Sequence, residues 1–345
     1  YNNSDIIGIK REASGSFSVK IKRRHGLVTS GCTRCNECFV VCPVVIPNEF
    51  DASMVARRAI YTPFPQAVPG PYVIDLDHCL NKPPIFLPCM KCHEACPPKV
   101  IDFDIIRDEE HEVKASSIIL STGFELVDPF VLPEYGYGRH PDILTSMEFE
   151  RLLSSAGPTG GEILKPSNMH HPHNLVFVLC AGSRTKDSKE FCSRFCCMYT
   201  IKEAIQALDH GVKDITVLYM DIRSYGKGFD KFYKRAKDEG VKFVRGRGAR
   251  IEEQDGKIII RYEDVVSGKI KDMPADMVVL ALGVRPSPGV DALTQVLNVE
   301  LESDGFIKGL NGTRGFIETN VPGIYAAGSA AGPKDIPDSV TEGCA

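Results

Sequence analysis

Eight of the thirteen cysteines in this 345-residue chain fall into two runs whose spacing suits metal ligation. The first run, at residues 32–43, has the pattern C-x2-C-x2-C-x3-C-P. Three thiolates on such a tight loop can take three corners of one iron–sulfur cube, while the fourth thiolate is carried toward a second cube. The first run therefore predicts a partner run elsewhere in the chain.

The partner run lies at residues 79–97 and repeats the C-x2-C-x3-C-P half of the first pattern. The simplest assignment is two four-iron clusters with four thiolates each, in which the last cysteine of each run joins the first three cysteines of the other run. The first cluster would be bound by Cys32, Cys35, Cys38 and Cys96, and the second by Cys79, Cys89, Cys92 and Cys42.

Structural zinc is the main alternative, because paired C-x2-C knuckles often hold zinc. A zinc ion takes four ligands, so eight cysteines in two crossed runs exceed one zinc site and fit two clusters better. Disulfides explain the spacing less well, because closely packed thiols in a chain without a signal peptide are normally ligands.

Four further cysteines form a C-x11-C-x3-C-C group: Cys180, Cys192, Cys196 and Cys197. They follow the apolar run at residues 174–179, which predicts a strand of a parallel sheet. A nicotinamide-binding domain would place a G-x-G-x-x-G loop here to approach a pyrophosphate, and that fingerprint is missing. We interpret the four thiols as ligands of a third [4Fe–4S] cluster. A set of buried structural cysteines is the alternative, since free cysteine is among the most buried residue types.

The composition argues against several classes of protein. A net charge of −4 is unlike that of a nucleic-acid binder, which usually displays a strongly basic domain. No apolar run approaches the roughly 20 residues that span a bilayer, and the N-terminus has no targeting pattern. We therefore expect a cytoplasmic protein without a transmembrane segment. Because the chain opens with Tyr1 and stops inside what looks like an unfinished element, we also expect a segment of a longer polypeptide.

Strands and helices alternate along much of the chain, as they do in an α/β fold. Residues 5–30 predict two strands joined by a turn at residues 13–15, and residues 126–173 read as linker and surface helix. Further on, the pattern predicts helices at residues 201–210 and 229–239, strands at 214–220, 241–244 and 277–282, and a hairpin at 251–263.

Two turns resemble flavin-binding motifs of two-dinucleotide-binding flavoproteins. The apolar run at residues 115–124 leads to Thr122 and Gly123, similar to the Ala-Thr-Gly turn where the chain leaves the flavin domain. Residues 318–328, ETNVPGIYAAG, resemble the second flavin motif, which ends in Gly-Asp. Here Gly328 is present and Ser329 stands in the aspartate position. These four residues are candidate flavin contacts.

Taken together, the chain resembles the A subunit of heterodisulfide reductase, a flavin- and iron–sulfur-containing family of methanogens and related anaerobes. The likeness covers the whole chain, including residues 63–69, 193–199, 229–236 and 332–337. It implies an α/β, thioredoxin-reductase-like core that binds FAD, a two-cluster ferredoxin-like α+β domain inserted into that core, and a third cluster where a nicotinamide would bind. By the same likeness, a small residue such as Ser329 is the family's own choice.

Lys202 matches a lysine that this family places beside the isoalloxazine ring, so the resemblance makes it the candidate catalytic residue near flavin N5. A fixed ammonium there would stabilise the reduced, anionic flavin. A solvated helix lysine is the alternative.

The resemblance also implies a division of the chain into five parts. We expect the end of a first FAD-domain portion at 1–30, the ferredoxin-like domain at 31–104, and a return to the FAD domain with linker at 105–172. A degenerate nucleotide-binding-like domain with the third cluster would follow at 173–285, and the C-terminal FAD-domain portion at 286–345.

The activity implied by the resemblance is electron transfer, with FAD converting between two-electron and one-electron chemistry. In bifurcating versions, electrons from a hydrogenase or formate dehydrogenase part at the flavin, toward ferredoxin and toward B- and C-type subunits that reduce a disulfide. A homodimer within a larger complex is expected. Alternatives are an NAD(P)H-oxidising flavoprotein, a non-bifurcating subunit that holds clusters and docks partners, and a subunit of a quinone- or benzoyl-CoA-reducing complex.

The thirteenth cysteine, Cys344, lies outside the three groups. It is either a further metal ligand or a plain thiol.

Overall fold

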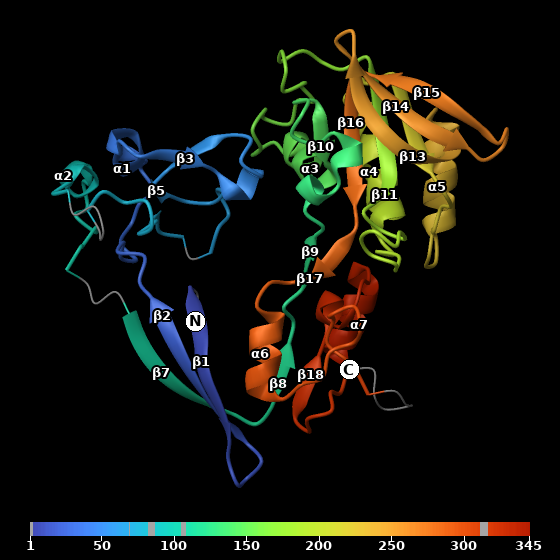
Figure 1. Ribbon diagram of the computed structural model, residues 1–345. Coiled ribbons are helices and arrows are strands. Elements are labelled where there is room, and N and C mark those ends of the chain that lie inside the picture. Colours follow the sequence, from blue (N-terminus) through green and yellow to red (C-terminus); the bar gives the residue numbers. More distant parts are fainter. Residues whose placement is uncertain (1–2, 69, 82–86, 105–107, 311–316) are drawn as a thin grey trace. The chain divides into compact units, whose positions relative to one another are not determined.

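The computed structural model describes residues 3–68, 70–81, 87–104, 108–310 and 317–345. The chain divides into two compact units, unit 1 (Tyr1–Ser116) and unit 2 (Ser117–Ala345), which are coloured blue to teal and teal to red (Figure 1). Among the described residues, no helix combines the length and the apolar character needed to cross a membrane.

Unit 1 is built on a three-stranded antiparallel sheet in the order β1–β2–β7. The strands β1 (Ser4–Arg11) and β2 (Phe17–Arg24) form the expected hairpin, and β7 (Asp108–Ala115) pairs with β2 along its whole length. Because β2 and β7 are neighbours in the sheet, the residues between them form an insertion in one connection. The five-part division of the chain stays a prediction.

Short elements make up the insertion. The helices are α1 (Glu37–Val41) and α2 (Lys91–Ala95), which pack against each other. The strand pairs are β3 (Val45–Pro47) with β4 (Ala56–Arg58), and β5 (Ile60–Tyr61) with β6 (Val73–Ile74); the 3-10 helix η1 (Glu49–Asp51) joins β3 to β4. Their buried core joins apolar side chains to cysteines, so the thiols are part of the packing: Leu27, Ile60, Tyr72, Ile74, Ile101, Cys38, Cys92 and Cys96.

A seven-stranded mixed sheet forms the centre of unit 2, in the order β10–β16–β11–β12–β13–β14–β15. The first five strands in that order are parallel, and the last three pair antiparallel. The strands are β10 (Ile143–Thr145), β11 (Asn174–Ala181), β12 (Asp214–Tyr219), β13 (Lys242–Gln254), β14 (Lys257–Asp264), β15 (Lys269–Ala275) and β16 (Met277–Leu282).

Helices cover one face of this sheet, as expected for βαβ units. α4 (Cys196–Asp209) packs on β11, β12 and β16, and it contacts both α3 (Ser146–Leu153) and α5 (Phe229–Asp238). Alternate residues of β11 point to opposite faces. Phe177 meets Phe149 of α3 edge-on, with ring centroids 5.4 Å apart, whereas Val176 and Val178 join the core on the other face.

The strand β10 and the buried side of α3 were not foreseen, because residues 126–173 read as linker and surface helix. The helix is present, but Phe149 and Leu152 are buried, and β10 pairs with β16 in the main sheet. Proline, glycine and histidine around these short elements hide the apolar pattern. The helix begins with a capping box in which Thr145 and Glu148 exchange hydrogen bonds with each other's backbone N–H.

Shorter elements complete unit 2. β8 (Ile118–Leu120) lies parallel to β18 (Ile324–Ala326), and β9 (Phe124–Leu126) pairs antiparallel with β17 (Val284–Pro286). The remaining elements are η2 (Pro129–Val131), η3 (Pro133–Tyr135), α6 (Val290–Leu297), η4 (Gly328–Ala331) and α7 (Ile336–Cys344).

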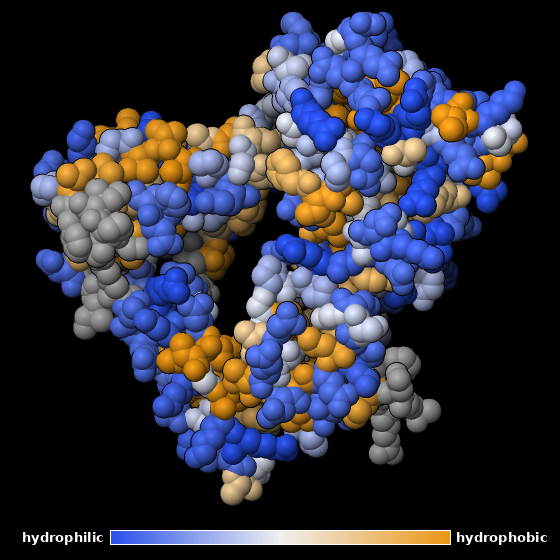
Figure 2. Space-filling model, in the orientation of Figure 1, coloured by the Kyte–Doolittle hydropathy of each residue, from blue (hydrophilic) through white to orange (hydrophobic). Residues whose placement is uncertain are grey.

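Large apolar side chains remain exposed on unit 1 close to the cysteine runs. Val40 of α1 is 69% exposed, and Val45 of β3 and Phe50 of η1 are exposed as well. Figure 2 shows apolar surface over this part of unit 1, where α1 and β3 lie in Figure 1. Contiguous apolar surface of this kind often marks a contact site.

Candidate metal centres

Cysteines from both runs of unit 1 surround one small cavity. Its lining includes the four thiols assigned to the first cluster: Cys32, Cys35, Cys38 and Cys96. Apolar side chains close the space between them, among them Val28, Tyr72 and Ile101. The structure therefore brings together all four residues that the spacing placed on the first cluster, although Cys96 lies 58 residues after Cys38.

A second cavity has the matching arrangement. It is lined by the four thiols assigned to the second cluster: Cys42, Cys79, Cys89 and Cys92. Ala59, Ile60 and Ile74 form part of its apolar wall. Among the described residues, no three His, Cys, Asp or Glu side chains converge closely enough to hold a single metal ion.

The two short helices explain why the last cysteine of each run crosses to the other cavity. In α1, Cys38 lies inside the helix and Cys42 caps its C-terminus; in α2, Cys92 and Cys96 hold the equivalent positions. Each helix thus presents its first cysteine to one cavity and its last to the other. Because α1 and α2 pack together, the exchange is reciprocal.

The thiols are crowded and partly withdrawn from water. Burial, and then the charge of Cys32 and Cys96, raises the pKa of Cys38 to about 11. Burial, and then the charge of Cys79, raises the pKa of Cys92 to about 12. Several thiolates in one such cavity repel each other unless positive charge lies between them. An iron–sulfur cluster supplies that charge, so the residues present fit the group that the spacing predicts.

The third group of cysteines gathers at the carboxyl end of β11. Cys180 lies next to the end of that strand with a φ of 62°, in the left-handed region that residues other than glycine rarely adopt. Cys196 and Cys197 are the first two residues of α4, the helix that follows. Strands β16 and β12 flank β11 on either side, so the group lies at the switch point of the sheet, where α/β folds bind ligands.

These thiols also act on one another. Burial, and then the charge of Cys197, raises the pKa of Cys180 to about 11, and burial followed by Cys180 raises that of Cys196 to about 12. The backbone N–H of Arg194 donates to Cys192 Sγ at 3.2 Å. The structure therefore places all four predicted residues in one electrostatic group, at the position that the missing glycine-rich loop would occupy.

The candidate flavin turns meet at the ends of adjacent strands. Thr122 and Gly123 follow β8, and Gly328 and Ser329 follow β18, its parallel neighbour. Gly123 and Gly328 have φ values of 73° and 68°, which suit glycine. Thr122 Oγ1 is buried and has no hydrogen-bond partner among the described residues. An unpaired buried hydroxyl fits a site that a polar ligand completes.

One contact at these turns was not foreseen. The Gly328 N–H donates to Glu342 Oε2 of α7 at 2.8 Å, and Lys334 Nζ pairs with the same carboxylate at 2.6 Å. The backbone N–H of one candidate flavin contact is thus already bonded to an internal carboxylate. No sequence signal predicts this contact, because it depends on how α7 packs on η4.

Lys202 makes its polar contact away from these turns. Its ammonium forms an ion pair with Glu150 of α3, and the side chain is partly exposed. The described residues give Lys202 no hydrogen bond or ion pair to Thr122, Gly123, Gly328 or Ser329. Its role beside the flavin stays a prediction.

The next residue of α4 was missed by the sequence reading. Glu203 is 2% exposed, and its Oε2 has no hydrogen-bond partner in the described chain. Thr200 and Gln206 on the same helix also carry buried oxygen atoms without a partner there. Burial raises the pKa of the Glu203 carboxyl well above its ordinary value, against a smaller lowering by Lys202.

Glu203→Gln should stabilise the protein at neutral pH. Because the folded state holds the Glu203 proton more tightly than the unfolded chain, the contribution of this group to stability is fully present below the unfolded pKa of about 4.3 and falls as pH rises. The variant should therefore raise the melting temperature at pH 7, and the difference should shrink toward pH 4. The exposed Glu253→Gln is the control; equal curves for both variants would show that Glu203 is not buried as a neutral acid.

Comparison with known proteins gives a consistent family. A model of the pyridine nucleotide-disulphide oxidoreductase family matches residues 199–343. Over 95% of its length the chain is 43% identical to the iron-sulfur A subunit of the CoB–CoM heterodisulfide reductase of Methanocaldococcus jannaschii, and it covers 50% of that protein. Over its full length it is 36% identical to the A subunit of the ferredoxin/F420H2-dependent CoB–CoM heterodisulfide reductase of Methanosarcina acetivorans, covering 43%.

Among solved structures, a thioredoxin reductase of Lactococcus lactis aligns with a TM-score of 0.43 at 17% identity, over 83% of this chain and 82% of that one. The family match and the mixed sheet confirm the α/β fold class. The chain spans about half the length of the curated relatives it matches. Along nearly all of its own length, the chain is similar to heterodisulfide reductase A subunits, at 43% and 36% identity to these two relatives.

Proposed function

We propose that this chain is the part of a heterodisulfide reductase-type oxidoreductase that carries electrons through a flavin and three four-iron clusters. The observation that carries the proposal is the reciprocal arrangement in unit 1. There α1 contributes one cysteine to each of the two cavities, and α2 does the same. Eight thiols in two adjacent sets suit two clusters that exchange electrons. One relative is named as an iron-sulfur subunit, which supports the same view.

The residues of the chain would hold and insulate these groups. Cys32, Cys35, Cys38 and Cys96 would bind the first cluster, and the other two sets the second and third. When bound, clusters of this kind take up and release single electrons, and a flavin exchanges electrons singly or in pairs. Apolar walls such as Ile60 and Ile101 keep water away from the thiolates and so help to set the potential.

The flavin would be FAD, held in part by the turns after β8 and β18. Thr122 Oγ1 is the polar atom in this region that lacks a partner in the described residues, and Gly123 and Gly328 let the backbone turn without side-chain strain. Lys202, if released from Glu150, would supply positive charge next to the reduced ring.

We further propose that the electrons come from a hydrogenase or formate dehydrogenase and leave toward ferredoxin and disulfide-reducing B- and C-type subunits, with bifurcation at the flavin and a homodimeric arrangement. The names of relatives support this, since they include H2-, formate- and ferredoxin-dependent heterodisulfide reductases. The exposed apolar side chain of Val40, between Cys38 and Cys42, offers a partner a contact beside both cavities.

Anaerobic reduction of the full-length protein tests the proposed function. Stepwise addition of dithionite should deliver about five electrons per chain, one for each cluster and two for the flavin. These electrons are those taken up by the groups bound within the span of this chain. They are obtained as the difference between the electrons taken up by the full-length protein and those taken up by a truncated protein that lacks this span. NADH should not reduce the groups held within this span, because no glycine-rich nucleotide loop follows the strand at residues 174–179. Uptake of no electrons, or reduction by NADH, would contradict the proposal.

A further inference from the structure

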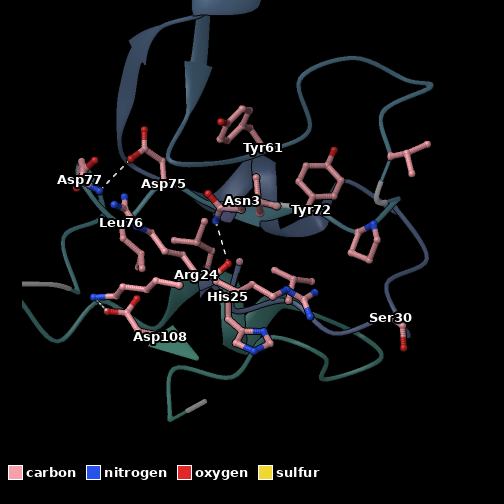
Figure 3. Close-up of a pocket in the computed structure, with 18 residues that line it drawn as sticks. Asn3, Arg24, His25, Ser30, Tyr61, Tyr72, Asp75, Leu76, Asp77 and Asp108 are labelled. Carbon is pink, nitrogen blue, oxygen red and sulfur yellow. Dashed lines mark hydrogen bonds and ion pairs between the residues drawn. The ribbon is translucent and has the colours of Figure 1, made fainter. Parts of the chain in front are cut away.

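Unit 1 contains a large cavity that neither cluster assignment uses. It measures about 980 Å3 and is lined by β2 and the residues after it, by Tyr61 of β5, and by the segment that contains Tyr72 and β6 (Figure 3). We call it the Tyr61–Tyr72 pocket. Its volume lies at the upper end of the range found for small-molecule sites.

The pocket shares walls with both thiol cavities. Tyr72 and Val28 line the pocket on one side and the cavity of Cys38 on the other. Ile74 lines the pocket and also the cavity of Cys92. A ligand in the Tyr61–Tyr72 pocket would therefore be separated from either candidate cluster by single side chains.

Its inner wall suits a flat aromatic molecule. In Figure 3 the rings of Tyr61 and Tyr72 lie on one side of Asn3, while Arg24, His25 and Asp108 lie on the other. Arg57 stacks over Tyr61, 4.0 Å from the ring centroid, and Tyr72 donates a hydrogen bond to Asn36, so both rings are held in place. Rigid aromatic and apolar walls are typical of sites for aromatic ligands.

The charges around the pocket leave a cation available. Lys22 pairs with Asp108 at 2.8 Å, Arg24 with Asp5 at 2.7 Å, and Asp75 with Arg57 at 2.8 Å. His25 lies 3.0 Å from Glu109. Arg23 lines the pocket and is only partly exposed, and its guanidinium makes no hydrogen bond or ion pair within the described residues. A guanidinium that is partly shielded from water and has no anionic partner can bind an acidic group on a ligand.

We propose that the Tyr61–Tyr72 pocket binds an aromatic electron carrier that bears a phosphate, carboxylate or sulfonate group, with Tyr61 and Tyr72 against its ring and Arg23 on its acidic group. The electron-carrying part of this proposal rests on the proposed function of the thiols, whereas the binding part does not. A cluster held by the thiols would supply one electron for each electron that the bound carrier takes up, and any protons that the reduced carrier needs would come from water.

Binding of anthraquinone-2-sulfonate, an aromatic anion, tests the pocket in the full-length protein. We expect saturable binding, measured by calorimetry on protein that has been loaded with FAD and then freed of unbound FAD, so that the flavin site does not contribute. Arg23→Ala should weaken it about tenfold, because a charge-assisted hydrogen bond is lost. Lys20→Ala removes a positive charge from an exposed position of the same strand and should change the affinity less than about twofold. Benzyl viologen, an aromatic cation, should bind at least tenfold more weakly.

The outcomes separate the pocket from the clusters. Equal affinity in Arg23→Ala and Lys20→Ala, or no saturable binding, would overturn the pocket. Binding is measured on protein with and without reconstituted iron, so it is read independently of metal. If the sulfonate binds through Arg23 but the reduced, iron-loaded protein does not reduce it, the pocket stands as a binding site, and its link to the proposed electron path is lost.

Discussion

Alanine at Cys38 and alanine at Cys96 should abolish the same cluster signal, although the two residues belong to different runs. Both thiols line the first cavity, and a four-iron cluster with three thiolates is labile. Cys92→Ala and Cys42→Ala should abolish the other signal, because those residues share the second cavity. Each variant should lose about four iron atoms per chain, measured chemically and by electron paramagnetic resonance of the reduced protein.

Cys344→Ala is the matched control, since this thiol is exposed at the end of α7 and lies outside all three sets. Its iron content and spectra should equal those of the unchanged protein. If Cys42→Ala removed the same signal as Cys38→Ala, each run would bind its own metal, and the crossing at α1 and α2 would be wrong.

Cys196→Ala should remove a third cluster and leave both signals of unit 1 in place. Cys196 lies buried at the start of α4 and is coupled to Cys180 and Cys197. Loss of its thiolate leaves an incomplete set, so about four iron atoms per chain should again be lost. Cys180→Ala should have the same effect, since it removes another member of the group.

The same variants decide between a cluster and buried structural cysteines. A structural cysteine behaves as a small apolar side chain, and its replacement by alanine costs about 1 kcal/mol of stability and no metal. Unchanged iron in both Cys196→Ala and Cys180→Ala, with only a small fall in melting temperature, would leave this chain with the two clusters of unit 1 alone.

The cysteine sets were predictable because short-range spacing determines them. Three cysteines within seven residues must share a loop, and a helix of five residues carries Cys42 away from Cys38. The location of the third set followed from a strand, an absent glycine loop and a helix, since the carboxyl end of a parallel strand is where such folds bind ligands.

Features that depend on packing between distant residues were not predictable. The ion pair of Lys202 joins residues 52 positions apart and requires α3 to lie against α4. The contact of Glu342 with Gly328 depends on how α7 folds back. The Tyr61–Tyr72 pocket is lined by residues between Asn3 and Asp108, so no local pattern announces it. β10 is only three residues long, too short for its period to be recognised.

X-ray diffraction at the iron absorption edge, from crystals grown without oxygen, tests the central claim most directly. We expect strong anomalous density among Cys32, Cys35, Cys38 and Cys96, a second peak among Cys42, Cys79, Cys89 and Cys92, and a third beside Cys180, Cys192, Cys196 and Cys197. Density that appears only at the zinc edge, or sulfur–sulfur bonds within these sets, would contradict the account.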